Sequence, residues 1–168
     1  MLTLLFSLLC AFAEPSKTVQ QLGPVHVGKK FPIFGGYTSK NEYVSFKKSI
    51  GKADLTIVSY FATWCEPCKK NLPIMEQFIK KNNNKVQGFY IALEKESGKV
   101  NSFAKKLKLE TPILMDKFES FAKKHGVIQE DGKVSLPKTF LVDKKGNVLD
   151  IVVLEGDDFD DLLEKRLK

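Results

Sequence analysis

The pattern of apolar and polar positions changes repeatedly along the chain between a strand-like and a helix-like form. Continuous apolar runs rich in β-branched and aromatic residues predict buried strands over residues 55–61, 86–93, 139–142 and 148–154. Apolar positions three or four residues apart predict amphipathic helices over residues 66–81, 100–107 and 157–167. Weaker patterns predict a hairpin within 31–46, a short strand at 113–115 and a short helix at 118–124.

Individual residues mark the expected ends of these helices. Pro73 lies inside the 66–81 pattern and predicts a kink there, and three asparagines at 82–84 end it. Ser97 is the expected N-cap of the following helix. Gly126 ends the short helix, since glycine readily adopts the conformation that follows a helix.

The order of these elements predicts an α/β domain. A strand, a helix, a strand and a helix are followed by an antiparallel hairpin and a last helix. The first two core strands should be parallel, because a helix connects them. We therefore expect a central mixed sheet flanked by helices, preceded by an N-terminal β-hairpin extension. The 168 residues suffice for one such domain.

The composition of the N-terminal residues predicts a targeting segment. Residues 1–13 contain no charged side chain and end in Ala11-Phe12-Ala13, which is typical of a secretory signal peptide. Cleavage there would leave a flexible lead-in at 14–27 and a domain at 28–168. The alternative is an uncleaved hydrophobic tail, which would tether the chain to a membrane. We expect an exported protein, periplasmic or otherwise extracytoplasmic.

Charge argues against a nucleic-acid partner. The chain has 27 basic and 20 acidic residues, for a formal charge of +7. All basic residues except Arg166 are lysines, and seven Lys-Lys pairs are spread evenly along the sequence. Nucleic-acid surfaces usually cluster their basic residues and use arginine. The sequence therefore predicts a solvated basic surface.

Redox chemistry is predicted at Trp64-Cys65-Glu66-Pro67-Cys68, between the 55–61 strand and the 66–81 helix. At the helix N-terminus, Cys65 would face unpaired N–H groups and the positive end of the dipole, which lower its pKa. Cys68 lies one turn further, on the apolar face. We expect Cys65 to attack a substrate disulfide and Cys68 to resolve the mixed disulfide. Pro67 suits the first turn, where no N–H is needed.

Neighbouring charges should act on Cys65 in opposite directions. Glu66 is an exposed anion that opposes a thiolate, whereas Lys69 and Lys70 favour it. A zinc site would need four ligands, and His26 and His125 have no ligand partner at a useful spacing, so we expect neither metal nor cofactor. His125 instead suits the C-terminus of the short helix.

The sequence Ser59-Tyr60-Phe61-Ala62-Thr63-Trp64-Cys65-Glu66-Pro67-Cys68, followed by Pro73, resembles the thioredoxin superfamily. Residues 28–34 and 136–146 resemble its TlpA/ResA-like branch of exported proteins, with a similarity that covers residues 28 to about 165. The resemblance implies a thioredoxin fold. It also implies that Pro137 is cis and faces the cysteine pair, and that Leu136 offers its backbone to an extended substrate.

The chain departs from the family pattern at three places. Ser59 replaces the buried Asp of thioredoxins, and Asn71 replaces the Glu of ResA-like members. The usual carboxylate for moving the proton of Cys68 is therefore absent from both positions. The segment 126–135 is longer than usual, and its Asp-Gly pair predicts a turn at the rim of the site. A peroxidase is disfavoured, because Ala62 stands where such a site needs Thr.

The resemblance implies a thiol-disulfide oxidoreductase that reduces disulfides of partner proteins, for example in cytochrome c maturation. An upstream membrane thiol reductase would recharge it, and we expect a monomer. The alternatives are an oxidant that forms disulfides and a non-catalytic metal-binding or chaperone module. The expected catalytic residues are Cys65, Cys68 and Pro137, and the supporting residues are Trp64, Glu66, Pro67, Asn71 and Leu136.

Overall fold

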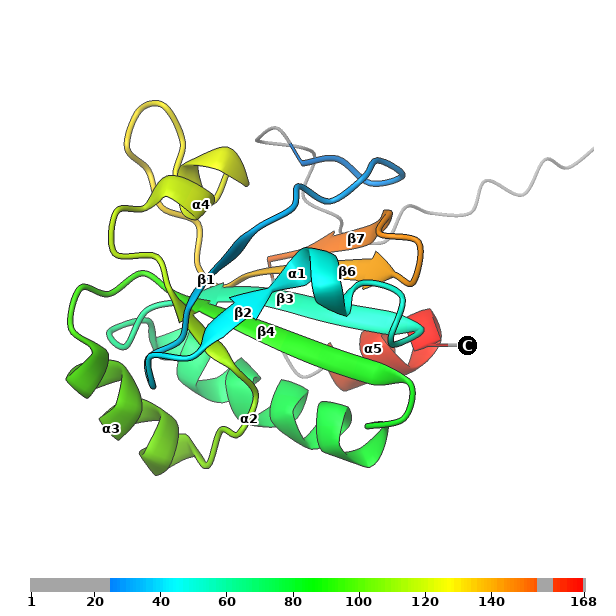
Figure 1. Ribbon diagram of the computed structural model, residues 1–168, viewed down its shortest axis with the longest axis horizontal. Helices are drawn as coiled ribbons and strands as arrows, with labels where there is room; N and C mark the ends of the chain where they lie inside the picture. The colour runs from blue at the N-terminus through cyan, green and yellow to red at the C-terminus, as the bar shows by residue number, and fades with distance from the viewer. Residues whose placement is uncertain (1–24, 154–158, 168) are drawn as a thin grey trace, which may run out of the picture.

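A five-stranded mixed sheet forms the centre of the computed structural model, which describes residues 25–153 and 159–167 (Figure 1). The strand order is β5-β4-β3-β6-β7, with β3, β4 and β5 parallel and β6 and β7 antiparallel to their neighbours. The strands are β3 (Leu55–Phe61), β4 (Val86–Ala92), β5 (Ile113–Met115), β6 (Lys138–Asp143) and β7 (Val148–Val152). The predicted α/β architecture and parallel first pair are confirmed. The predicted signal segment 1–13 lies outside the described residues.

Each face of the sheet is covered by its own set of elements. One core contains residues of α2 (Glu66–Lys81), α3 (Ser97–Leu107) and α5 (Phe159–Leu167). The other face is covered by α1 (Phe46–Ser49), α4 (Ser120–Lys124) and residues around the small sheet of β1 (Gly35–Tyr37) and β2 (Tyr43–Ser45). The predicted N-terminal hairpin is therefore present.

Strand β3 is buried along its whole length, which explains its continuous apolar sequence. Ile57 and Phe61 pack into the core beneath α2, whereas Val58 and Tyr60 pack into the opposite core. This alternation follows from the two-residue period of a strand. β3 is thus fixed from both faces, and it delivers the segment that follows it to a defined position.

Residues 28–38 cross one face of the sheet and reach both of its edges. Val148 and Gly28–Lys29 exchange two backbone hydrogen bonds of 2.8 Å at the start of β7. At the other edge, Thr38 forms an isolated bridge with Leu114 of β5. Packing begins ahead of this segment, since Val25 is already buried.

The boundaries of α2 agree with the prediction, but two helix starts do not. α2 is continuous through Pro73, and Asn82 is its C-cap. Ser97 is the first helical residue of α3 and Glu96 occupies the cap position, so the predicted cap was wrong by one residue. α4 begins at Ser120 rather than 118, because Glu119 takes a left-handed backbone conformation (φ 58°).

Candidate redox site

Cys65 and Cys68 form a disulfide at the junction between β3 and α2. Cys65 is the N-cap of α2, and its Sγ accepts a hydrogen bond of 3.3 Å from the backbone N–H of Cys68. Pro67 lies in the first turn, as expected. The helix N-terminus therefore directs an N–H group and its positive dipole end at the first sulfur, an arrangement that stabilises a thiolate there.

The two cysteines differ in their access to solvent. Cys65 is 4% exposed and Cys68 is fully buried in the core beneath α2. Trp64, directly before Cys65, is 64% exposed. Cys65, beside the exposed Trp64, is therefore the more accessible of the two cysteines.

Glu66 and Lys69 form an ion pair on the surface of α2. The hydrogen bond from Lys69 lowers the pKa of Glu66, so this carboxylate remains ionised. Because each charge offsets the other, the expected effects of Glu66 and Lys69 on the Cys65 thiolate should largely cancel. Lys70 is exposed, and its expected effect on the thiolate stays a prediction.

Neutral polar groups occupy the two positions where the family resemblance would place carboxylates. The Ser59 hydroxyl lies 2.8 Å from the Thr139 hydroxyl, and both residues are buried. The Thr139 hydroxyl in turn lies 4.0 Å from the Met75 sulfur of α2. Asn71 is buried on α2, one turn beyond Cys68. The polar interior beside the cysteines is thus uncharged at these positions.

The Leu136–Pro137 segment lies at the same end of the sheet as the disulfide. Its peptide bond is cis, and Pro137 is buried directly before β6. The first residue of β6, Lys138, pairs with Tyr60 near the end of β3. Leu136 packs against the core that contains both cysteines.

Glu94 is a site residue that the sequence pattern did not reveal. Its Oε1 accepts a 3.0 Å hydrogen bond from the backbone N–H of Thr63 and a second bond from the Thr63 hydroxyl. The carboxylate thereby anchors the turn two residues before Cys65. The register of β3 with β4 pairs Phe61 with Ala92, so continuing it by two residues would have placed Glu94 beside Thr63.

Lys138 was also missed. It is buried, and its Nζ donates a 2.8 Å hydrogen bond to the Gly126 carbonyl. Burial lowers its pKa. The bond closes the base of the long 126–137 loop, whose two sides are joined by an Ile128–Val134 bridge. The predicted Asp-Gly turn lies at the tip of this loop, where Gly132 has φ 82°.

His125 differs from its expected role at the end of α4. It follows the helix, but it is fully buried, and its Nδ1 lies 2.6 Å from the Tyr60 hydroxyl. Burial lowers the pKa of His125 from its ordinary value of 6.5 to about 3. The ring is therefore neutral, and it does not interact with the helix dipole as a cation.

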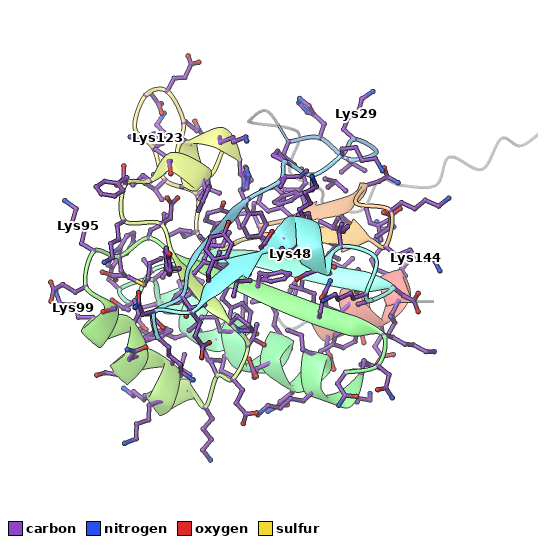
Figure 2. The ribbon with its side chains drawn as sticks, viewed as in Figure 1. Lys29, Lys48, Lys95, Lys99, Lys123 and Lys144 are labelled. Carbon is purple, nitrogen blue, oxygen red and sulfur yellow. A yellow bond between two sulfur atoms is a disulfide. The ribbon has the colours of Figure 1, made fainter. Side chains whose placement is uncertain are left out.

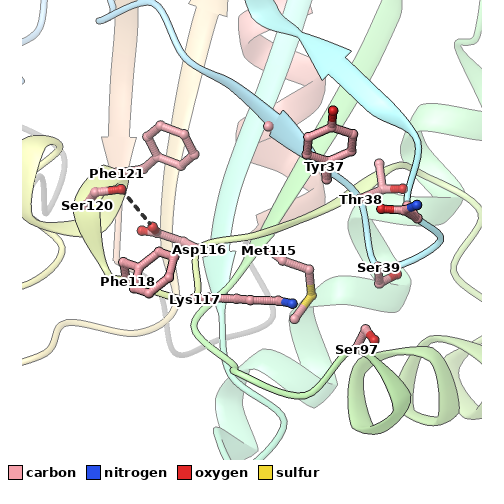
Figure 3. Close-up of a pocket in the computed structure, with 12 residues that line it drawn as sticks. Tyr37, Thr38, Ser39, Ser97, Met115, Asp116, Lys117, Phe118, Ser120 and Phe121 are labelled. Atoms are coloured by element: carbon pink, nitrogen blue, oxygen red, sulfur yellow. Dashed lines mark hydrogen bonds between the residues drawn. The ribbon is translucent and has the colours of Figure 1, made fainter.

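A cavity of about 390 Å³ opens between β1 and the segment that follows β5 (Figure 3). Tyr37, Ser97, Met115 and Phe118 are among its lining residues, and neither cysteine is. Asp116 in its wall accepts hydrogen bonds from the Ser120 hydroxyl and the Ala122 N–H. This carboxylate organises the start of α4, apart from the sulfur chemistry.

Residues 25–153 and 159–167 contain neither a cluster of metal ligands nor a helix suited to span a membrane. No group of three or more His, Cys, Asp or Glu side chains there is arranged to hold a metal ion. No helix within the same ranges has the length and apolar character needed to cross a bilayer.

The fold and the buried cysteine pair at a helix N-terminus define a thiol-disulfide oxidoreductase with a thioredoxin-like fold. Residues 27–151 match the AhpC/TSA family, and the chain belongs to that family. It is 30% identical over 145 residues to the "Thiol-disulfide oxidoreductase ResA" of Bacillus cereus (strain ATCC 10987 / NRS 248), covering 86% of this chain and 78% of that protein. It is 31% identical over 132 residues to the "Thioredoxin-like protein YneN" of Bacillus subtilis, covering 77% and 72% of the two chains.

Solved structures agree with the predicted fold. A putative thiol:disulfide interchange protein DsbE from Chlorobium tepidum aligns with a TM-score of 0.71 at 22% identity, over 85% of this chain and 96% of that one. A thioredoxin family thiol:disulfide interchange protein from Chlorobium tepidum TLS aligns with a TM-score of 0.70 at 28% identity, over 84% and 97% of the chains. The thioredoxin-like fold predicted from the sequence is confirmed.

Proposed function

We propose that this chain is an exported reductant that opens disulfide bonds in partner proteins through Cys65 and Cys68. The observation that carries the proposal is the position of the Cys65 sulfur, which accepts a hydrogen bond at the N-terminus of α2 and is the more accessible of the two. A thiolate held there is a good nucleophile near neutral pH.

The reaction would proceed in two exchange steps. The Cys65 thiolate attacks one sulfur of the partner disulfide, forming a mixed disulfide and releasing the other partner sulfur as a thiolate. Cys68, after losing its proton, attacks the Cys65 sulfur, closes the Cys65–Cys68 bond and releases the second partner thiolate. Two electrons pass to the partner, and the oxidised form described here is the product.

The partner would dock at the end of the sheet that carries Trp64 and the Leu136–Pro137 segment. Trp64 offers an exposed aromatic surface next to the reactive sulfur. Leu136, directly before buried Pro137, would offer its backbone to an extended segment of the partner, in the manner of an added strand. Pro137 would then shape the contact beside the sulfur rather than take part in electron transfer.

The relatives support the class of partner and the location. Several are named ResA, and one aligned structure is described as a secreted Mycobacterium tuberculosis disulfide oxidoreductase homologous to E. coli DsbE. The apolar residues 1–13 favour the same location for this chain. We propose oxidised apocytochrome c or a metal-delivery protein as substrate, a membrane thiol reductase as electron donor, and a monomeric state.

The test is to trap partners in cells with Cys68→Ser. Without the resolving thiol, the mixed disulfide at Cys65 should persist and be recovered as a reductant-sensitive adduct. The matched control is the Cys65→Ser/Cys68→Ser double variant, which should yield none. Equal recovery from both variants would refute the exchange mechanism.

The direction of electron flow needs a second measurement. Alkylation of the wild-type protein directly in cells should find the cysteine pair mainly reduced and accumulating as the disulfide when the upstream reductase is removed. A pair that is mainly oxidised in normal cells would instead identify an oxidant. Zinc or copper bound in equal amount to the purified protein would identify a metal-binding module.

A further inference from the structure

The lysines are spread along the sequence, but folding gathers a group of them at one end of the sheet. This group, here called the basic pole, surrounds the starts of β3 and β4 and the β6–β7 turn. Its members are all exposed: Lys29, Lys30, Lys47, Lys48, Lys52, Lys85, Lys144 and Lys145.

Hydrogen bonds and an ion pair connect the segments that make up the basic pole. Segment 29–31 runs along the β6–β7 turn, since Phe31 N–H donates to the Gly146 carbonyl at 2.8 Å. Lys144 pairs with Asp54 at 3.5 Å, and the Asp54 N–H donates to the Lys85 carbonyl at 2.8 Å. The end of α1 joins the same region, because the Gln87 side chain donates to the Ser49 carbonyl at 3.0 Å.

The charge of the chain is concentrated at this pole. Among the described residues of these segments, eight are lysines and only Asp54 and Asp143 are acidic, for a formal charge of +6. The whole chain has +7. Asp143 is occupied within the turn, accepting from Asn147 and from the backbone N–H of Lys145. The rest of the chain is therefore nearly neutral.

The basic pole lies at the opposite end of the sheet from the cysteines. The sulfurs follow the last residue of β3, whereas the pole surrounds its first residue, and α2 extends back from the sulfurs for 16 residues, or about 24 Å. Figure 2 shows Lys29 and Lys144 of the pole on one side of the view, and Lys95 and Lys99, which precede and begin α3, on the other.

We propose that the basic pole binds the surface of a bilayer that contains anionic phospholipids. The end of the sheet that carries Cys65 and Cys68 then faces away from the membrane. Lysine ammonium groups suit many scattered phosphates, whereas base recognition favours arginine, which the pole lacks. The N-terminal chain also leads to this pole: apolar residues 1–13 precede Lys29 by only some fifteen residues. A membrane near that segment would meet the pole first.

The first test measures binding of the full chain to sedimented vesicles of phosphatidylcholine, with or without one third phosphatidylglycerol. Residues 1–13 contribute to binding of both kinds of vesicle, so the difference in binding between the two vesicles measures the contribution of the basic pole. We expect at least about tenfold stronger partition into anionic vesicles at about 0.05 M salt, largely lost at about 0.5 M. Equal binding to both vesicles would overturn the proposal.

Matched lysine variants locate the effect. Lys29, Lys48, Lys52 and Lys145 changed together to Gln should abolish the preference for anionic vesicles, and none of the four takes part in the ion pairs of the described residues. The control changes four exposed lysines elsewhere, Lys95, Lys105, Lys117 and Lys124, to Gln and should keep the preference. Equal loss in both variants would show a general charge effect and overturn the assignment. Tighter binding of the wild type to a DNA duplex than to the vesicles at the same salt would also overturn it.

The orientation can be read from Trp64, the one tryptophan of the chain. Brominated lipids quench tryptophans that contact the bilayer, so Trp64 fluorescence should be unchanged when the protein binds anionic brominated vesicles. Strong quenching would place the cysteine end of the sheet on the membrane and refute the proposed orientation. This readout requires no disulfide exchange, so it is independent of the proposed function.

Discussion

At the scale of single residues, Cys65 and Cys68 differ because of where α2 begins. Only Cys65 stands at the N-cap, and only its sulfur accepts a backbone N–H at the helix end. Cys68 is enclosed by the apolar core. The proposed division of labour between two otherwise identical side chains would therefore follow from one strand-to-helix junction.

This asymmetry predicts unequal alkylation of the reduced protein. At neutral pH, Cys65 should react with iodoacetamide at least about ten times faster than Cys68, because the helix N-terminus lowers its pKa and its sulfur is more accessible. Mass spectrometry of timed samples measures both rates. In Cys65→Ser, Cys68 should label slowly, and rapid labelling there would contradict the assigned roles.

Position 71 should control the thiols through its charge. Asn71 is buried one turn beyond Cys68, so Asn71→Glu would place a carboxylate in a poorly solvated position near the pair. Like charges repel, and the apparent pKa of at least one cysteine should rise. Thiolate absorbance at different pH values measures the change, with Asn71→Gln as the uncharged control. Superimposable curves for the Glu and Gln variants would show that position 71 does not act on the thiols.

At the scale of elements, the 126–137 loop is held at its base by Lys138. The bond from its Nζ to the Gly126 carbonyl joins the start of β6 to the end of the α4 region. Leu136 and Pro137 lie just inside this closure. The position of the proposed substrate-binding segment therefore depends on a buried side chain of the same loop region.

Replacing Lys138 should affect protein substrates selectively. Lys138→Met should raise KM for a protein disulfide by about three- to tenfold, because the loop loses a buried charge-assisted hydrogen bond. The rate with a small aromatic disulfide should stay the same, since the sulfurs are untouched. Steady-state assays with both substrates measure this. Lys133→Met, at the exposed end of the same loop, is the control and should resemble wild type; equal losses with both substrates for Lys138→Met would exclude a docking role.

The sequence was informative where patterns are long and local. β3 and α2 have the predicted bounds, because all seven positions of the strand are buried and the apolar spacing of the helix recurs over four turns. The starts of α3 and α4 were misplaced because single backbone conformations, such as that of Glu119, do not alter a periodic pattern. Glu94 and Lys138 escaped notice because their partners lie 31 and 12 residues away, and only strand register or loop closure brings them together.

At the scale of the whole molecule, the buried imidazole of His125 links acid stability to the core between α4 and the sheet. Below pH 6.5, the unfolded chain can protonate His125, whereas the folded chain cannot until the pH approaches 3. The unfolded state thus binds more protons, and stability is lost as the pH falls through this range. Above pH 6.5 the contribution is fully present.

The prediction is a pH-dependent loss of roughly 1.4 kcal/mol per pH unit below 6.5 from this residue alone. Urea unfolding of wild type and His125→Asn between pH 4 and pH 7 should show a shallower dependence in the variant, even if its overall stability is lower. Tyr60→Phe keeps the buried imidazole and should keep the steeper dependence. Parallel curves for wild type and His125→Asn would show that His125 does not carry this effect.

The segment 28–38 also affects how the sheet meets other copies of the chain. Unpaired strand edges are templates for aggregation. Here Thr38 and Ser39 bond to the outer strand β5, and Gly28–Lys29 bond to the start of β7. Further along β7, the buried Asp150 carboxylate accepts the Ile151 N–H and pairs with Arg166, so that this backbone donor is already occupied. Segment 28–38 and Asp150 thus occupy backbone groups at both edges of the sheet, which disfavours the addition of a strand from another copy of the chain.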